Sequence, residues 1–264
     1  MLQDSKAKIT SLQNWGDYFV LAVETPKIAA EARPGQFLMV RVNDPSWPLL
    51  RRPFSIHARE GSRIEIFFQV VGRGTAALAR KGQGEALDIL GPLGKGFDLD
   101  RDLKGKPTFL VGGGRGIAPL YFLGRELGDL GAEVTVLYGG KCVTDLPARE
   151  KFEAAGLKIV CSTDDGTFGF RGLATRLLEF EMGKGAPAAV FACGPEAMLK
   201  KTSEIARAHS IPAQLSLESM MGCGFGACWG CVKRIRKDGE GKWRKICEDG
   251  PVFRAEDVVW EEGD

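Results

Sequence analysis

The stretch PTFLVGGGRGIAP, residues 107–119, decides how the second half of this chain of 264 residues folds. Residues 107–111 are mostly apolar and predict a buried strand, and a run of glycines follows before Ala118 and Pro119. Proline is favoured in the first turn of a helix, so we expect a helix over 118–130. A glycine-rich turn from a strand into a helix N-terminus can hold a phosphate group. The turn does not match the G-x-G-x-x-G fingerprint, and tight packing alone would also explain it.

Strands and helices alternate after this turn. Further strands are expected at 133–138, 157–161 and 188–192, and helices at 146–155, 173–181 and 196–208. Such alternation predicts a doubly wound sheet of parallel strands. The turn Cys193-Gly194-Pro195 follows the last of these strands. Ligands of open sheets lie at the carboxyl ends of strands, so this turn and the glycine run together predict a dinucleotide crevice.

The residues before this domain show a different pattern of strand and turn signals. Short β-rich runs at 18–24, 36–42 and 63–71 are separated by proline and glycine, and a short helix is expected at 75–81. This pattern predicts a small antiparallel β-barrel. The sequence RRPFSI, residues 51–56, offers an arginine for phosphate, an aromatic ring for stacking and a serine hydroxyl for a ring atom. The sequence GPLG, residues 91–94, is interpreted as a turn in a domain linker.

Four of the seven cysteines form the pattern C-x4-C-x2-C-x15-C, at Cys223, Cys228, Cys231 and Cys247. The C-x4-C-x2-C spacing with a distant fourth cysteine is that of plant-type [2Fe–2S] sites. A structural zinc site usually shows two C-x2-C pairs, and only one is present here. Glycines at 222, 224, 226 and 230 let the backbone turn sharply around a cluster. We therefore expect a [2Fe–2S] cluster, with zinc as the alternative.

A basic segment lies between the third and fourth of these cysteines. It consists of Lys233, Arg234, Arg236 and Lys237, with Lys242, Arg244 and Lys245 after Asp238-Gly239. One interpretation is a solvated hairpin, and the other is a surface for an acidic partner.

The whole chain has 36 basic and 34 acidic residues, which argues against a nucleic-acid binder. No apolar run approaches the length of a membrane span, the N-terminus is no signal peptide, and a cytoplasmic setting is expected.

In this order, the motifs resemble one family. The sequence RPFS, residues 52–55, is similar to the flavin motif R-x-[YF]-[ST] of the ferredoxin–NADP⁺ reductase superfamily. The motifs GPLG, GGGRG and CGP resemble its later nicotinamide-domain motifs. The sequence SLE at 216–218, the cysteine pattern and CEDGPVF at 247–253 are similar to the electron transfer subunit of NAD-linked, class 1B, dihydroorotate dehydrogenases.

The resemblance implies three parts: a FAD-binding β-barrel at 1–101, an NAD(P)-binding α/β domain at 102–215 and a [2Fe–2S] subdomain at 216–264. It implies that FAD is held by Arg52, Pro53, Phe54, Ser55, Gln69, Val70, Val71, Gly74 and Thr75. The nicotinamide nucleotide is then held by Gly112, Gly113, Gly114, Gly116, Cys193 and Gly194, and the cluster by the four cysteines. Hydride and electron transfer require no general acid or base side chain, so no catalytic residue is predicted.

The resemblance also implies a function and a partner. Electrons would pass between an FMN-containing subunit that oxidises dihydroorotate and NAD⁺, through the cluster and FAD, in a heterotetramer of pyrimidine biosynthesis. The alternatives are a subunit of a bifurcating transhydrogenase or of a sulfide or sulfite enzyme, a stand-alone NADH reductase, and a zinc-stabilised binding module. Arg115 and Phe54 depart from common family residues, and Lys141 offers a cation for a 2′-phosphate. NAD and NADP therefore both stay open.

Overall fold

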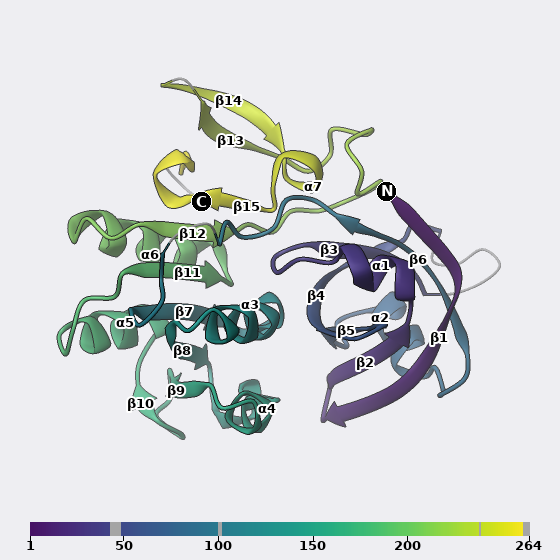
Figure 1. Cartoon of the computed structure of the whole chain (residues 1–264), viewed down its shortest axis with the longest axis horizontal. Coiled ribbons are helices and arrows are strands. Elements are labelled where there is room, and N and C mark those ends of the chain that lie inside the picture. The colour runs from purple at the N-terminus through teal and green to yellow at the C-terminus, as the bar shows by residue number, and fades with distance from the viewer. Residues whose placement is uncertain (43–48, 100–101, 238, 261–264) are drawn as a thin grey trace.

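The computed structural model describes residues 1–42, 49–99, 102–237 and 239–260. Figure 1 shows a β-barrel beside a sheet covered by helices, with the C-terminal segment lying over the adjoining ends of both. The barrel and the doubly wound sheet confirm the predicted fold class. None of the helices in the described ranges is long and apolar enough to cross a membrane.

The barrel is closed by six antiparallel strands in the order β1-β2-β5-β4-β3-β6. The strands are β1 (Leu2–Trp15), β2 (Tyr18–Glu24), β3 (Phe37–Arg41), β4 (Arg52–Glu60), β5 (Arg63–Gln69) and β6 (Ala86–Leu93). The long strand β1 pairs with both β2 and β6 and shifts register between Ile9 and Ser11. Such a shift bends a strand, which allows the sheet to close. Two short helices, α1 (Pro26–Glu31) and α2 (Arg73–Ala79), complete this part, and α2 confirms the short helix expected there.

The interpretation of GPLG as a turn in a domain linker is wrong. Gly91, Pro92 and Leu93 are the last residues of β6, where Gly91 pairs with Leu2 and Leu93 pairs with Phe37. Proline has no N–H for the ladder, so strands carry it where the regular pairing is interrupted. Here the β3–β6 register shifts between Phe37 and Met39, which accommodates Pro92.

The second part is a seven-stranded sheet in the order β10-β9-β8-β7-β11-β12-β15. Its strands are β7 (Pro107–Gly113), β8 (Glu133–Gly140), β9 (Lys158–Thr163), β10 (Phe170–Arg171), β11 (Ala189–Cys193), β12 (Ala213–Ser216) and β15 (Val252–Arg254). Its longer helices are α3 (Ala118–Asp129), α4 (Arg149–Ala154), α5 (Ala174–Met182) and α6 (Glu196–Ala208), all in the expected segments. The chain leaves β7 toward β8 on one side and later returns to β11 on the other. The carboxyl ends of β7 and β11 therefore flank a topological switch point, where such sheets bind ligands.

The C-terminal segment is joined to the sheet by strand pairing. β15 pairs antiparallel with β12, and neither strand is predicted from the sequence. A hairpin of β13 (Val232–Lys237) and β14 (Glu240–Lys245) precedes the short helix α7 (Ile246–Asp249). The hairpin agrees with the expected one, although Asp238 at its turn lies outside the described residues. Ile246 and Cys247 share one apolar core with Met39 of the barrel and Leu215 of the sheet.

Candidate functional site

A cleft opens between the barrel and the sheet, with a volume of about 510 Å³. This flavin-side cleft is lined from the barrel by Phe37, Arg52, Pro53, Phe54, Ser55, Phe67, Phe68, Gln69, Val71, Gly72, Arg73, Gly74 and Thr75. Its opposite wall consists of Arg115, Ala118, Cys193, Ser216, Leu217, Glu218, Ser219, Met221 and Pro251. Known ligand pockets span ~300–1,000 Å³, so the cleft has the size of a ligand site.

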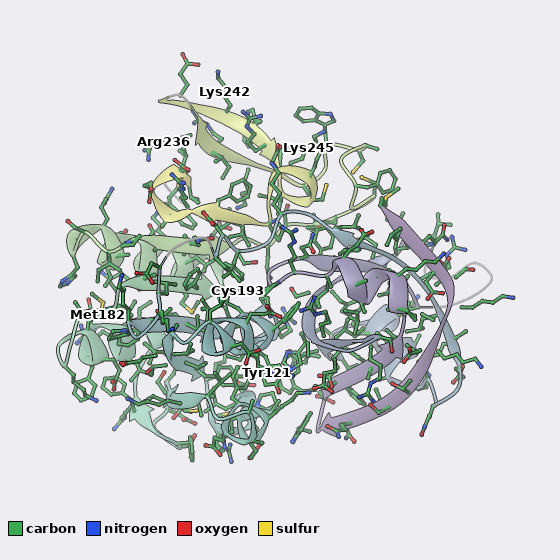
Figure 2. All side chains as sticks on the ribbon, viewed as in Figure 1. Tyr121, Met182, Cys193, Arg236, Lys242 and Lys245 are labelled. Carbon is green, nitrogen blue, oxygen red and sulfur yellow. The ribbon has the colours of Figure 1, made fainter. Side chains whose placement is uncertain are left out.

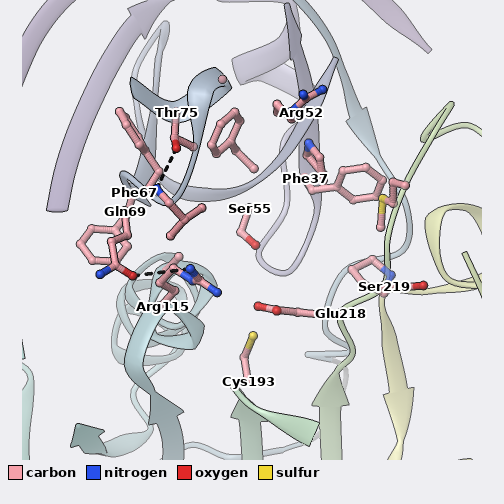
Figure 3. Close-up of a pocket in the computed structure, with 18 of the residues that line it drawn as sticks. Phe37, Arg52, Ser55, Phe67, Gln69, Thr75, Arg115, Cys193, Glu218 and Ser219 are labelled. Carbon is pink, nitrogen blue, oxygen red and sulfur yellow. Dashed lines mark hydrogen bonds between the residues drawn. The ribbon is translucent and has the colours of Figure 1, made fainter. Parts of the chain in front are cut away.

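The predicted flavin residues meet in this cleft with one exception. Val70 is not among the residues that line it; its N–H donates to the carbonyl oxygen of Asp17, and its side chain packs against the barrel core. Thr75 acts on the loop before α2. Its hydroxyl oxygen accepts the N–H groups of Val71 at 2.9 Å and Gly72 at 3.2 Å and donates to the Gly72 carbonyl at 3.1 Å. Thr75 therefore holds the shape of the loop that faces the cleft (Figure 3).

A second cleft of about 690 Å³ lies over the carboxyl ends of the parallel strands. This nucleotide-side cleft is lined by the loops after β7, β8, β9 and β11, with Gly113, Gly114, Gly116, Gly140, Lys141, Asp164, Gly194 and Met198 among the residues. Gly112 does not line it, because a side chain there would point at Ile117 and Leu120 in the packed interior. The predicted nicotinamide residues are thus brought together, except that Gly112 serves packing and Cys193 faces the flavin-side cleft.

The two turns predicted to form the crevice touch each other. A Cβ atom on Gly116 would overlap the carbonyl oxygen of Cys193 and lie 2.5 Å from the Cα atom of Gly194. Gly114 has a φ of +52°, in the left-handed region that favours glycine. Close approach of two backbones and a left-handed turn both require glycine. The glycine run therefore sets the floor of the nucleotide-side cleft at the switch point.

Gln69, Arg115 and Glu218 line both clefts. Arg115 extends from the glycine loop toward Gln69 of the barrel, with Nη1 3.5 Å from Oε1. Burial raises the pKa of Glu218, and the nearby Arg115 opposes that effect. Figure 3 shows Ser55, Arg115, Cys193 and Glu218 pointing into the space between barrel and sheet. The two clefts therefore form one continuous site with a junction at these side chains.

Cys193 at this junction is a neutral thiol. It is 3% exposed, and burial together with the Glu218 carboxylate raises its pKa to about 12. A thiol is nucleophilic only as the thiolate, so Cys193 is not a nucleophile near neutral pH. Its side chain lines the flavin-side cleft without supplying a reactive group.

Sequence reasoning did not identify Glu218, Arg115 and Tyr18 as residues of the site. Glu218 follows the unpredicted strand β12, and Arg115 belongs to the quoted glycine loop without an assigned role. Tyr18 comes from the barrel, and its hydroxyl donates to Asp145 Oδ1 at 3.1 Å on the wall of the nucleotide-side cleft. A strand prediction for 213–216 would have placed Glu218 at a carboxyl end, but the contact of Tyr18 arises only from the tertiary structure.

Three of the predicted cluster cysteines, Cys223, Cys228 and Cys231, lie in one loop, and Cys247 lies in helix α7 after the hairpin. The thiol of Cys228 affects the pKa of Cys223, and the thiol of Cys231 affects that of Cys247, so each of these two pairs lies close together. The N–H of Gly226 donates to Cys247 Sγ at 3.2 Å, and the N–H of Cys247 donates to Cys231 Sγ at 3.4 Å. Burial raises the pKa of Cys223, but N–H groups of the loop outweigh burial and lower that pKa to about 6. N–H groups aimed at sulfur stabilise thiolate ligands.

The four cysteines are the donor set of a [2Fe–2S] cluster, in which four thiolates bind two irons. In the described ranges no three Cys, His, Asp or Glu side chains are arranged to hold a single metal ion. Gly224, with a φ of +83°, abuts Met39 of the barrel, and Met221 of the same loop lines the flavin-side cleft. This loop, residues 220–231 and called the thiol loop below, therefore lies directly beside that cleft.

The basic hairpin is partly engaged within the chain. Lys233 Nζ lies 2.6 and 2.7 Å from the two carboxylate oxygens of Glu196, and Arg236 donates to the carbonyl oxygen of Glu256 at 2.9 Å. Lys245 forms an ion pair with Glu248, and its Nζ lies 4.9 Å from the ring centre of Trp229. Figure 2 shows Arg236, Lys242 and Lys245 spread along this segment.

Comparison with known proteins gives a consistent result. The family model for the iron–sulfur cluster binding domain of dihydroorotate dehydrogenase B matches residues 218–259. The electron transfer subunit of dihydroorotate dehydrogenase B (NAD(+)) from Desulforamulus reducens is 38% identical over 92% of this chain and 93% of its own length. The subunit of the same name from Enterococcus faecalis is 42% identical over 86% of this chain and 87% of its own.

Solved structures agree. The NADH-dependent reduced ferredoxin-NADP oxidoreductase, described for flavin-based electron bifurcation, superposes with a TM-score of 0.83 at 28% identity, covering 97% of this chain and 91% of that one. A ferredoxin NADP+ reductase from Neisseria gonorrhoeae, with bound FAD and NADP, has a TM-score of 0.65 at 20% identity, covering 77% and 90%. The second likeness supports the fold alone.

Proposed function

Because this chain belongs to the family of electron transfer subunits of dihydroorotate dehydrogenase B, we propose that it carries electrons between a partner flavin subunit and NAD⁺. The partner oxidises dihydroorotate in pyrimidine biosynthesis, and this chain is its NAD-linked flavin and iron–sulfur oxidoreductase subunit. The observation that carries the proposal is the arrangement of the site: two clefts share a junction, and four thiols lie beside one of them.

In this proposal the barrel residues Arg52–Ser55, with Gln69, Val71, Gly74 and Thr75, hold FAD. Arg52 provides a cation for phosphate, and Thr75 orders the loop beside it by accepting the N–H groups of Val71 and Gly72. Ser55 points into the cleft and can donate a hydrogen bond to the flavin ring (Figure 3). Val70 contributes only through the barrel core.

The nucleotide is held over Gly113, Gly114 and Gly116, with Gly194 beside them and Cys193 at the junction. Lys141 and Asp164 both line the outer part of this cleft, at the ends of β8 and β9. An acidic residue near a strand end favours the ribose 2′-hydroxyl of NAD, and a cation accommodates the 2′-phosphate of NADP. The family name specifies NAD(+), and the Asp164 carboxylate supports NAD for this chain.

Cys223, Cys228, Cys231 and Cys247 hold the [2Fe–2S] cluster, and N–H groups of the loop stabilise the charge of Cys223. When bound, the cluster supplies one-electron transfer, and FAD supplies the exchange between single electrons and the hydride of a nicotinamide. The side chains of this chain bind and orient these groups, and none of them is required as a general acid or base. The residue ranges 1–101, 102–215 and 216–264 are proposed as the FAD, NAD(P) and cluster parts.

The partner is the FMN-containing catalytic subunit, in a heterotetramer. Met220, Phe225 and Trp229 in the thiol loop are 90%, 47% and 59% exposed. Exposed apolar side chains grouped on one loop mark interaction surfaces. We place the contact with the partner here, because single electrons must enter or leave next to the cluster. A cytoplasmic setting completes the proposal, since cluster thiols require reducing conditions.

The first test is an absorption spectrum of the anaerobically purified protein with assays for iron, sulfide and flavin, before and after NADH. We expect flavin bands over a broad iron–sulfur absorption, and bleaching of both by NADH. A colourless protein with stoichiometric zinc would contradict the proposal. Addition of the catalytic subunit and dihydroorotate should then reduce NAD⁺, whereas full activity without any partner would identify a stand-alone reductase.

A second candidate function is supported by the TM-score of 0.83 to the bifurcating oxidoreductase. In that case the chain is the NAD(P)H-oxidising subunit of a different complex, such as a bifurcating transhydrogenase. The two candidates share both cofactors and differ in the partner. Purification of the native complex and identification of the second subunit separates them.

A further inference from the structure

A fully buried histidine connects the two halves of the site. His57 lies in β4, two residues after Ser55 of the flavin motif, and is 0% exposed. Its Nδ1 atom lies 2.7 Å from the carbonyl oxygen of Ala118. Ala118 is the first residue of α3, directly after the glycine loop, and lines the flavin-side cleft. One hydrogen bond therefore ties the strand of the flavin motif to the helix behind the nucleotide loop.

The surroundings of His57 define its protonation state. A carbonyl oxygen can only accept, so Nδ1 carries the proton, and Nε2 is buried with no hydrogen-bond partner in the described part of the chain. The ring stacks on Tyr121 with centroids 4.8 Å apart and lies 5.6 Å from Phe67. Burial and then the Lys151 cation lower the pKa of His57 to about 3. The neutral ring is therefore a fixed hydrogen-bond donor.

The contacts around His57 belong to the boundary between barrel and sheet. Figure 2 shows Tyr121 at this boundary. Ion pairs cross it at Glu65–Lys151, at Arg59–Glu126 over 3.0 Å and at Arg125–Glu60 over 3.1 Å. The last two are about one-third exposed, and exposed pairs contribute little free energy and hold no precise geometry. The contacts Tyr18–Asp145 and Gln69–Arg115 also cross this boundary at the site, and among these contacts the hydrogen bond of His57 is the one that is fully buried.

We propose that His57 is a positioning residue that fixes the placement of the flavin side of the site relative to the nucleotide side. The inference rests on the proposed function, because it concerns hydride transfer between groups held on the two sides. Misplacement of reacting groups by ~1 Å can lower a rate by ~100-fold. Loss of the donor would leave Ala118 and β4 packed together but free to shift along their contact.

Three substitutions of His57 separate the hydrogen bond from the packing. In His57→Asn the amide is attached to Cγ, as Nδ1 is in histidine, so the donor to Ala118 can be kept. His57→Phe keeps a ring against Tyr121 and removes the donor. His57→Gln moves the amide one bond further out and is the matched control for His57→Asn. Each variant is purified with its cofactors, and stopped-flow absorbance follows anaerobic flavin reduction by NADH and the long-wavelength charge-transfer band.

We expect His57→Phe to retain FAD and iron and to bind NADH with an affinity within about twofold of the wild type. The limiting rate of flavin reduction should fall by about 10- to 100-fold, and the charge-transfer band should weaken. His57→Asn should recover most of both signals. A wild-type rate in His57→Phe, or equal losses in His57→Asn and His57→Phe, would overturn the inference. If His57→Phe loses FAD, the comparison is made between the other two variants. The limiting rate of flavin reduction must then be higher in His57→Asn than in His57→Gln, and equal rates would refute the role. Failure of NADH to reduce the wild-type protein would instead refute the proposed function.

Discussion

Gly116 is the residue at which the two loops of the nucleotide-side cleft meet. A methyl group there would strike the Cys193 carbonyl and the Gly194 backbone, which cannot move aside as a flexible side chain can. We expect Gly116→Ala to lower the free energy of unfolding by about 1–3 kcal/mol and to weaken NADH binding. Urea unfolding and NADH titration measure both effects. The control is Gly185→Ala, where a Cβ would meet nothing within 4 Å; equal behaviour of the two variants would disprove the contact.

Cys247 is the most distant in sequence of the four thiols and is 2% exposed beside Cys231. We expect Cys247→Ser to lose iron, sulfide and the broad visible absorption while FAD stays bound, because the flavin-side cleft is built from other residues. NADH should still bleach the remaining flavin bands, and transfer to the partner should stop. Cys142→Ser is the matched control, since Cys142 lies outside the thiol loop and contacts Thr144. Retention of iron in Cys247→Ser would exclude the residue as a ligand.

The places of residues that depend on spacing along the chain could be predicted from the sequence. The four cysteines, the RPFS motif and the glycine loop each act through neighbours within a few positions, and the structure places them along the clefts and the thiol loop. Glu218 and Tyr18 could not be predicted in the same way, because their contacts cross from one part of the fold to another.

At the scale of the element, the helix α2 and its preceding loop depend on Thr75. The hydroxyl accepts two backbone N–H groups, and capping interactions contribute ~0.5–2 kcal/mol. We therefore expect Thr75→Ala to weaken FAD binding by several-fold, about one kcal/mol, through disorder of the loop. Thr75→Ser keeps the hydroxyl and should bind FAD as the wild type does. Fluorescence titration of the apoprotein with FAD measures the difference, and unchanged affinity in Thr75→Ala would argue against this role.

The parallel strands of the sheet and their helices were predicted, whereas β1, β12 and β15 were not. The parallel strands and their helices appear within a few residues of the expected ranges, because apolar runs and flanking turns define them. The strand β12 has only four residues, and β15 has three, so neither has a run long enough to recognise. Gly91-Pro92 resembles a turn by composition, and only the interrupted pairing with β3 allows it in a strand.

At the scale of the whole molecule, His57 makes the joint between barrel and sheet sensitive to acid. Its pKa is lowered to about 3 in the folded chain, against a usual value of 6.5. Between these values the unfolded chain binds a proton that the folded chain does not, so stability must fall as the pH falls below 6.5. We expect the wild type to lose stability relative to His57→Phe by up to about 1.4 kcal/mol per pH unit. Urea unfolding at pH 7, 6 and 5 checks this, and parallel curves for both proteins would contradict it.

The C-terminal segment forms part of the wall of the flavin-side cleft. Leu217, Ser219, Met221 and Pro251 line it, although most of its other residues belong to the barrel. During synthesis, the barrel emerges from the ribosome long before these residues do. Translation must pass Pro251 before the cleft is enclosed, so the cleft is completed only together with the segment that carries the thiols. Enclosure of the flavin-side cleft and completion of the cysteine-bearing segment therefore belong to the same late stage of synthesis.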